Sequence, residues 1–370
     1  MNMVKFKKIK PKNVDWKFLF VAASLLIFGL FILSSASFVV GEKKWNDPQY
    51  YFKEQLFKGV LFGVVSFFIF LKMPLEFLKK YSFIFLIFSI FLLILVFFPK
   101  LGLSHSGSTR WLNLGPISFQ PSELIKLSFL IYLASWFDSR RRDLQKFSSG
   151  LLPFLIIIGI IGFLLFLQPN IGTFGIIALS AVAVYFAAGG QLRHMVIVGL
   201  SGLALFSVFI FLKPYGTERL KTFLNSQNDI KGAAYQINQS LMSIGVGGTG
   251  GIGINQNLVS TYLPETIGDS IFAVLAEKTG LFGVSFTLSL YFLFTIFSFR
   301  IALKSSEYFP KLLTVGITSW IIIQSFVNIA AISGIIPLTG VPLPFISYGS
   351  SALVVSLAGV GIIANISRYI

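Results

Sequence analysis

The chain has 370 residues, of which 55% are hydrophobic and only 12% are charged, and it carries a net charge of +16. A soluble domain of this size would need about twice that charged fraction, so the composition excludes a soluble globular enzyme, a disordered chain and a fibrous repeat. With no cysteine and only two histidines, the sequence also excludes a disulfide framework, a thiolate nucleophile, an iron–sulfur cluster and a His-rich metal site.

Ten stretches are apolar enough to cross a bilayer, since a spanning helix needs roughly 20 mostly apolar residues. The first follows six lysines within residues 1–17 and is too long for the apolar core of a signal peptide, so we expect a transmembrane helix there. We therefore predict an all-α polytopic membrane protein. The ten spans lie near 18–40, 56–71, 81–98, 119–137, 151–167, 171–189, 195–212, 270–299, 311–335 and 348–366.

The distribution of Lys and Arg predicts the orientation. With the N-terminus in the cytoplasm, the inner segments hold 18 basic residues and the outer segments hold 10, which agrees with the excess expected inside. Both termini then lie in the cytoplasm, with residues 1–17 as a basic cytoplasmic segment. Residues 213–269 form a long extracytoplasmic loop between helices 7 and 8, part of which we expect to be helical or re-entrant. The basic loops suit anionic lipid head groups, and no basic stripe interleaved with aromatic residues predicts nucleic-acid binding.

Two acidic residues, Glu265 and Asp269, lie where the long outer loop enters the eighth span. A carboxylate at this boundary can reach the head group of a lipid-linked substrate, and its partial desolvation favours use as a general base. The structural alternative for Asp269 is an N-cap, because an apolar run follows it. The pattern alone favours the cap, although the two roles do not exclude each other.

Three ionisable residues lie inside apolar spans. Placing such side chains in a membrane costs free energy, so a functional role is the first hypothesis for each. Glu123 and Lys126 are three residues apart, so they share a helix face and form either a structural ion pair or part of a head-group pathway. Glu277 follows Asp269 by about two helical turns, on a similar face. We expect the neighbouring Lys278 to snorkel toward the membrane interface.

Two further patterns are structural in character. The glycine-rich segment 245–253 lacks the Gly-Lys-Ser/Thr ending of a phosphate-binding loop, so we expect no nucleotide site. Close backbone approach, or a flexible lip over a groove, suits it better. Gln324 and Asn328, four residues apart in a span, predict hydrogen bonding between helices.

Six segments in chain order resemble the SEDS family (shape, elongation, division and sporulation), and together they cover nearly the whole chain. The segments are STRWLNLG at 108–115, FQPSELIK at 119–126, QPNIGT at 168–173, GAAYQINQS at 232–240, LPETIGDSIFA at 263–273 and PLTGVPLPFISYG at 337–349. Residues 239–241 and 363–368 lean toward the FtsW branch of this family over the RodA branch. The chain departs from the family pattern at Asn170, Gly268 and Ser350, where Asp, Thr and Gly are common.

The resemblance implies a single SEDS-type transmembrane domain over residues 1–370, with ten helices. It implies a glycosyltransferase that polymerises lipid II at the outer face of the bacterial cytoplasmic membrane, in division or else in elongation. The implied partners are a class B penicillin-binding transpeptidase and other divisome or elongasome membrane proteins. Asp269 falls on the family's essential aspartate, and its motifs carry over onto Arg110, Trp111, Gln120, Glu123 and Lys126.

These residues suggest a mechanism as a hypothesis. Asp269 deprotonates the acceptor sugar's 4-hydroxyl, whose oxygen attacks the donor's anomeric carbon, and undecaprenyl pyrophosphate leaves with inversion. The developing negative charge needs a cation or positioned donors, and the candidates are Arg110, Lys126, Arg219 and a divalent ion (Mg²⁺ or Mn²⁺) held partly by Asp269 or Glu265. We count Glu265 and Glu277 with the substrate-binding residues, and we expect no haem.

Two alternatives from other classes stay open. A lipid II flippase or transporter would use Glu123 and Lys126 more than Asp269. A non-catalytic division scaffold would tolerate substitution of every outer-loop acid.

Overall fold

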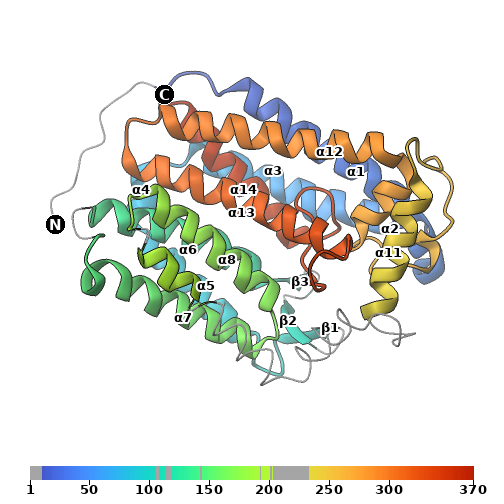
Figure 1. Ribbon diagram of the computed structural model, residues 1–370, viewed down its shortest axis with the longest axis horizontal. Helices are drawn as coiled ribbons and strands as arrows, with labels where there is room; N and C mark the ends of the chain where they lie inside the picture. Colours follow the sequence, from blue (N-terminus) through green and yellow to red (C-terminus); the bar gives the residue numbers. More distant parts are fainter. Residues whose placement is uncertain are drawn as a thin grey trace.

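The computed structural model describes residues 11–105, 108–113, 115, 118–141, 144–191, 193–200, 202 and 233–370. These residues form a helical bundle with one small sheet (Figure 1). The helices are α1 (Trp16–Trp45), α2 (Tyr50–Glu54), α3 (Phe62–Lys72), α4 (Leu75–Lys80), α5 (Ser82–Leu95), α6 (Pro121–Ser139), α7 (Leu152–Leu167), α8 (Ile171–Ala187), α11 (Ala233–Gly247), α12 (Ile271–Lys304), α13 (Tyr308–Ile332) and α14 (Ser350–Ser367), with π-helical turns η1 (Gln55–Leu61) and η2 (Phe147–Leu151) and a 3₁₀ turn η3 (Ser260–Tyr262).

Nine of the ten predicted spans coincide with helices of the described residues, and most of the tenth, 195–212, lies outside those residues. Five helical segments have the length and apolar composition to cross a membrane: Trp16–Trp45, Tyr50–Lys72, Ile271–Lys304, Tyr308–Ile332 and Ser350–Ser367. Three shorter apolar helices, α5, α7 and α8, accompany them. The predominantly helical fold is confirmed, whereas the count of ten crossings and the placement of the loops stay predictions.

Helices α13 and α14 run through the middle of the bundle, between α12 on one side and α6 and α8 on the other (Figure 1). Both are buried along most of their length, as expected for helices that are apolar on every face. Helix α3 packs closely along α14. A Cβ atom at Gly361 would come within 2.5 Å of the Phe67 carbonyl oxygen, so only glycine permits this approach.

A three-stranded antiparallel sheet between α5 and α6 adds to the predicted helices. Its strands β1 (Gly102–His105), β2 (Ser108–Asn113) and β3 (Ser118–Phe119) lie in the order β1-β2-β3. Leu103 pairs with Trp111, and Leu112 pairs with Phe119. β1 and β3 have only four and two residues, and the burial of β2 does not alternate along its six residues, so no alternating pattern predicts these strands.

Helix α12 is interrupted, although the sequence predicts one continuous span over 270–299. Gly280 has φ 59° and ψ −158°, a conformation that side-chain-bearing residues avoid. The glycine-rich segment packs against this break. Leu281 N donates to Gly248 O (3.0 Å), and a Cβ atom at Gly280 would lie 2.4 Å from Gly251 N. The prediction of close backbone approach at 245–253 is therefore confirmed.

The two ends of the bundle are formed by different segments of the chain. At one end, Lys12 N donates to Arg368 O (2.7 Å), so the two terminal segments meet there. The opposite end, which we call the far end, holds α2, α11 and the connection between α13 and α14 (Figure 1). Candidate functional residues of the outer loops gather at the far end.

Candidate active site

Asp269 lies in a tight turn of residues 265–270, which we call the Asp269 turn. The Glu265 carbonyl accepts hydrogen bonds from Gly268 N (3.0 Å) and Ser270 N (3.2 Å), and Glu265 has a positive φ of 49°. The Asp269 residue is half-buried and Glu265 is exposed. The N-cap hypothesis for Asp269 is wrong, because α12 begins at Ile271 and its N-cap residue is Ser270.

The backbone of the Asp269 turn is held from outside. Three consecutive carbonyl oxygens of the turn, those of residues 267, 268 and 269, each accept a hydrogen bond from α13 or from residues 337–349, which we call the clamp loop. A fourth contact comes from α11, where Gln236 Nε2 donates to Ser270 Oγ (2.8 Å). The three carbonyl contacts are Tyr348 N to Ile267 O (2.8 Å), Ser347 Oγ to Gly268 O (2.7 Å) and Asn328 Nδ2 to Asp269 O (2.8 Å).

The clamp loop is in turn held by two amide side chains one helical turn apart on α13. Gln324 Nε2 donates to Pro342 O (2.9 Å) and Asn328 Nδ2 donates to Val341 O (2.7 Å). Within the loop, Leu343 N donates to Ser347 Oγ (2.7 Å). Asn328 thus bonds the turn and the loop together, which is a helix-to-loop role beyond the helix-to-helix bonding predicted from its spacing.

Glu123 and Lys126 form an ion pair inside the bundle. Lys126 Nζ lies 2.8 Å from Glu123 Oε2, and the two side chains are only 1% and 2% exposed. The predicted pairing is confirmed. The ammonium also donates to Gln324 Oε1 (2.7 Å), which accepts a second bond from Trp320 Nε1 (2.8 Å). This contact joins α6 to α13, as the position of Gln324 predicted.

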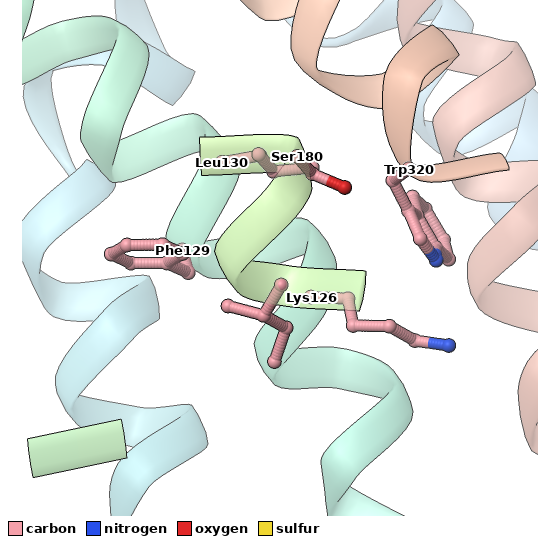
Figure 2. A pocket seen from close by; sticks show the side chains of 6 residues that line it. Lys126, Phe129, Leu130, Ser180 and Trp320 are labelled. Carbon is pink, nitrogen blue, oxygen red and sulfur yellow. The ribbon is translucent and has the colours of Figure 1, made fainter. Parts of the chain in front are cut away.

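Figure 2 shows Lys126 on α6 directed toward Trp320 on α13. The ammonium lies 5.1 Å from the centre of the Trp320 ring, within the range of a cation–π interaction. The space that Lys126, Ser180 and Trp320 enclose, with Phe129, Leu130 and Ile177, has no room for a water molecule. The ammonium is therefore surrounded by protein groups in this conformation.

Glu277 and Lys278 are both buried at the end of the first half of α12, and each binds the loop that precedes the turn. The Glu277 carboxylate accepts from the backbone N–H groups of residues 258, 259 and 260, at 2.9, 3.1 and 2.8 Å. Lys278 Nζ donates to Ile254 O (2.9 Å), Gln256 O (3.2 Å) and Asn257 Oδ1 (2.9 Å). The expectation that Lys278 snorkels is wrong, because its ammonium ends among these loop oxygens. Substrate binding by Glu277 stays a prediction, and its contacts support a structural role.

The motif residues Arg110, Trp111 and Gln120 belong to β2 and to the start of α6. Arg110 Nε donates to Gln168 O (3.1 Å) and its Nη2 donates to Pro169 O (2.5 Å), which ties β2 to the junction of α7 and α8. Trp111 is half-buried in β2. Gln120 directly precedes α6, and its backbone N donates to Ser351 Oγ at the start of α14 (3.2 Å).

Arg219 lies outside the described residues, and the substrate-binding roles of Arg110, Trp111 and Gln120 stay predictions.

The two carboxylates proposed for a cation lie on one turn. A Cβ atom at Gly268 would lie 3.4 Å from Glu265 Oε2, so this carboxylate stands over the residue before Asp269. Mg²⁺ is commonly held by one or two carboxylates together with substrate phosphates, and a cation at Asp269 and Glu265 stays a prediction. Within the described part of the chain, no group of three or more His, Asp or Glu side chains could hold a metal by itself.

Three residues that hold the Asp269 turn, Ser347, Tyr348 and Gln236, were not predicted from the sequence. They occur in the two family-like segments 337–349 and 232–240. Ser347 is a polar residue in a segment rich in Pro and apolar residues, whereas Gln236 lies among other polar residues and Tyr348 acts through its backbone N–H, so neither carries a local signal.

The comparison with protein families matches nearly the whole chain. The family profile of FtsW, RodA and SpoVE, described as cell cycle protein, matches residues 15–370. Stage V sporulation protein E of Bacillus subtilis is 35% identical over 362 residues, which are 97% of this chain and 98% of that protein. A probable peptidoglycan glycosyltransferase FtsW of Geobacter sulfurreducens is 34% identical over 358 residues, with 96% and 95% of the two chains covered.

Solved structures share the fold. A chain from a structure described as "Structural coordination of polymerization and crosslinking by a peptidoglycan synthase complex" superposes with a TM-score of 0.80 at 29% identity, covering 96% of this chain and 98% of that one. The rod shape determining protein RodA of Thermus thermophilus superposes with a TM-score of 0.72 at 26% identity, with 96% and 97% covered. The chain is a multi-pass membrane protein that belongs to the FtsW/RodA/SpoVE family, the SEDS family that its six segments resemble.

Proposed function

We propose that the chain is a peptidoglycan glycosyltransferase that polymerises lipid II at the outer face of the bacterial cytoplasmic membrane. Relatives named probable peptidoglycan glycosyltransferase FtsW, which cover almost the whole chain, support the activity. The single structural observation that carries the assignment is the Asp269 turn. It presents a half-buried carboxylate at the far end of the bundle on a backbone fixed by three external donors. The FtsW names and the cell cycle description favour division over elongation.

The chemistry follows from a half-buried aspartate on a backbone held by external donors. The Asp269 carboxylate takes the proton of the acceptor sugar's 4-hydroxyl, and that oxygen forms a bond to the donor's anomeric carbon. The bond between this carbon and the pyrophosphate oxygen breaks, and its electron pair leaves with undecaprenyl pyrophosphate. A single displacement of this kind inverts the anomeric centre. General base catalysis of this type contributes roughly 10²- to 10⁴-fold.

Negative charge at the leaving pyrophosphate requires a compensating group. Arg110 and Lys126 are engaged with protein carbonyls and with Glu123 and Gln324, which makes them weaker candidates than the sequence suggests. Arg219 remains a candidate. A divalent cation, when bound, would supply positive charge there, and Asp269 and Glu265 are the residues that would hold it.

We further propose a class B penicillin-binding transpeptidase as the partner. The structural neighbour from a peptidoglycan synthase complex, in which polymerization and crosslinking are coordinated, supports this partner. Other divisome or elongasome membrane proteins and anionic lipids complete the proposed environment. The basic residues of the predicted cytoplasmic loops suit the lipids.

The test is polymerisation of labelled lipid II by the purified protein with its transpeptidase partner, comparing wild type, Asp269→Asn and Asp47→Asn. Asp47 is the matched control, because it is another far-end carboxylate, paired with Lys53 at 2.8 Å. We expect glycan strands from wild type and Asp47→Asn, and a rate at least about 10²-fold lower from Asp269→Asn. Polymerisation by Asp269→Asn at the wild-type rate would falsify the role of Asp269.

The same preparation separates the alternatives. Movement of lipid II across protein-containing vesicles, with no glycan from any variant, would favour a flippase. Absence of both activities, with partner binding intact, would favour a scaffold.

A further inference from the structure

We propose that Asn328 and Ser347 are positioning residues that fix the backbone on both sides of Asp269, with Gln324 and Lys126 holding Asn328's partner loop in place. This inference rests on the proposed function, because it concerns the same carboxylate. It assigns Lys126 to the support of the site and not to contact with substrate.

The Asp269 turn needs external support because it lies just before a helix. The hydrogen-bond ladder of α12 begins at the Ser270 carbonyl, which accepts from Ala273 N (3.0 Å). The carbonyls of residues 267, 268 and 269 precede that ladder. Buried backbone carbonyls require partners, and these three find theirs on α13 and the clamp loop.

The positions of two of these bonds determine the backbone of Asp269. A peptide unit is planar, so each residue has only two soft backbone dihedrals. The Gly268 carbonyl, bonded by Ser347 Oγ, orients the plane before the Asp269 Cα atom, and the Asp269 carbonyl, bonded by Asn328 Nδ2, orients the plane after it. Fixing both planes fixes φ and ψ, and leaves only side-chain rotation to the carboxylate.

The donors are themselves fixed. Ser347 Oγ accepts from Leu343 N (2.7 Å) while it donates to Gly268 O, so its hydroxyl hydrogen has one direction. Asn328 Nδ2 uses its two hydrogens on Asp269 O and Val341 O, and both acceptors are backbone atoms. Asn328 is 1% exposed, so water has little access to its amide.

The support extends to the buried ion pair. Gln324 holds Pro342 O with its Nε2 group, and its orientation is set by Lys126 Nζ and Trp320 Nε1, which both donate to Oε1. If the Gln324 amide flipped, its nitrogen would face the Lys126 ammonium, and two donors would oppose each other. Glu123 balances the charge at 2.8 Å. The ion pair therefore specifies which end of Gln324 reaches the clamp loop.

The experiment compares Asn328→Leu with Asn365→Leu in the complex used for polymerisation. Asn365 is a matched control, since it is also 1% exposed and its Nδ2 also donates to two backbone carbonyls, Phe70 O (3.0 Å) and Met73 O (2.6 Å). It lies on α14 near Arg368, at the end of the bundle away from Asp269. Both variants lose the same kind of contact, and only one loses it at the Asp269 turn.

We expect Asn328→Leu to lower kcat about 100-fold, the size of effect produced by a small misplacement of a catalytic group, with KM for lipid II within about threefold of wild type. Asn365→Leu should keep both constants within about threefold. Amide hydrogen exchange in residues 265–273 should accelerate in Asn328→Leu only, because the exchange reports local opening. Ser347→Ala should lower kcat about tenfold and Ser347→Thr, which keeps the hydroxyl, should restore it.

Equal kcat values for Asn328→Leu and Asn365→Leu overturn the inference, even where exchange accelerates. The bond from Asn328 would then stabilise the Asp269 turn without aiding the reaction. If Asn328→Leu does not fold, equal kcat values for Ser347→Ala and Ser347→Thr overturn it. If the proposed function is wrong, wild type makes no glycan. Amide exchange at residues 265–273 still shows in that case whether Asn328 stabilises the Asp269 turn.

Discussion

Two buried acid–lysine pairs lie in apolar helices of the described part of the chain, and their charges find partners in different ways. In α6, Glu123 and Lys126 bind each other, and the ammonium also reaches Gln324. In α12, Glu277 and Lys278 are adjacent in sequence, and the carboxylate binds three backbone N–H groups while the ammonium binds three loop oxygens.

The difference follows from helical geometry. At 3.6 residues per turn, residues three apart lie about 60° from each other around the axis, and adjacent residues lie about 100° apart. The first spacing permits a direct ion pair, whereas the second directs the two charges to separate partners. Spacing thus decides whether two buried charges stabilise each other or organise a neighbouring loop.

The largest expected effect is the loss of the Glu277 carboxylate. Glu277→Leu removes the charged acceptor of three backbone N–H groups of residues 258–260, one buried and two part-buried, and a hydrogen bond to a charged group contributes about 1.5–3 kcal/mol. We expect the free energy of unfolding to fall by roughly 6 kcal/mol, measured by denaturant unfolding in mild detergent. Glu76→Leu, at an exposed acid on α4, is the control and should change stability by less than about 0.5 kcal/mol. Equal effects from the two variants would contradict the structural role.

The stability effects of substituting Glu123 and Lys126 in α6 should be strongly non-additive. Lys126→Met leaves the Glu123 carboxylate buried without its partner, which costs about 3–5 kcal/mol. The double variant Glu123→Leu/Lys126→Met removes both charges and should recover at least half of that loss. A double variant that is less stable than Lys126→Met would show that the pair is not an isolated unit.

The break in α12 at Gly280 lies just after the Glu277–Lys278 pair, and it can be tested directly. Gly280→Ala places a Cβ atom at a positive φ and against the Gly251 backbone, so we expect a loss of about 2 kcal/mol. Gly175→Ala on α8 is the matched control, because a Cβ atom there meets nothing within 4 Å and alanine favours a helix by about 0.5–1 kcal/mol. Unfolding midpoints that shift in the same direction would argue against the break.

The smallest effect concerns Lys278. Lys278→Met removes donors from carbonyl oxygens that retain part of their solvation, and we expect a loss of about 1 kcal/mol. Combined with Glu277→Leu, the two changes should couple less strongly than the changes in the α6 pair, because the two side chains do not bind each other directly. Coupling as large as that in α6 would remove the distinction between the pairs.

The apolar runs and the charge spacing were sufficient to predict the helices and the Glu123–Lys126 pair, since both depend on residues close in sequence. The break at Gly280 was missed because both halves of α12 are apolar, so the hydrophobic pattern continues across it. The N-cap hypothesis for Asp269 failed by one residue, at Ser270.

The support of Asp269 could not be predicted for a different reason. Asn328 and Gln324 occupy one helix face by their spacing, which indicated polar contacts on that face but not the identity of the partner. Those partners are backbone carbonyls of two loops. A backbone acceptor carries no sequence signature, because every residue has one.

The long sequence separation between the Asp269 turn and its donors also affects how the chain folds during synthesis. The donor to the Asp269 carbonyl follows it by 59 residues, and the donor to the Gly268 carbonyl follows by 79. During synthesis the first half of α12 emerges before either donor exists. In the nascent chain the candidate catalytic aspartate therefore lies in an unfinished turn until α13 and the clamp loop have been made.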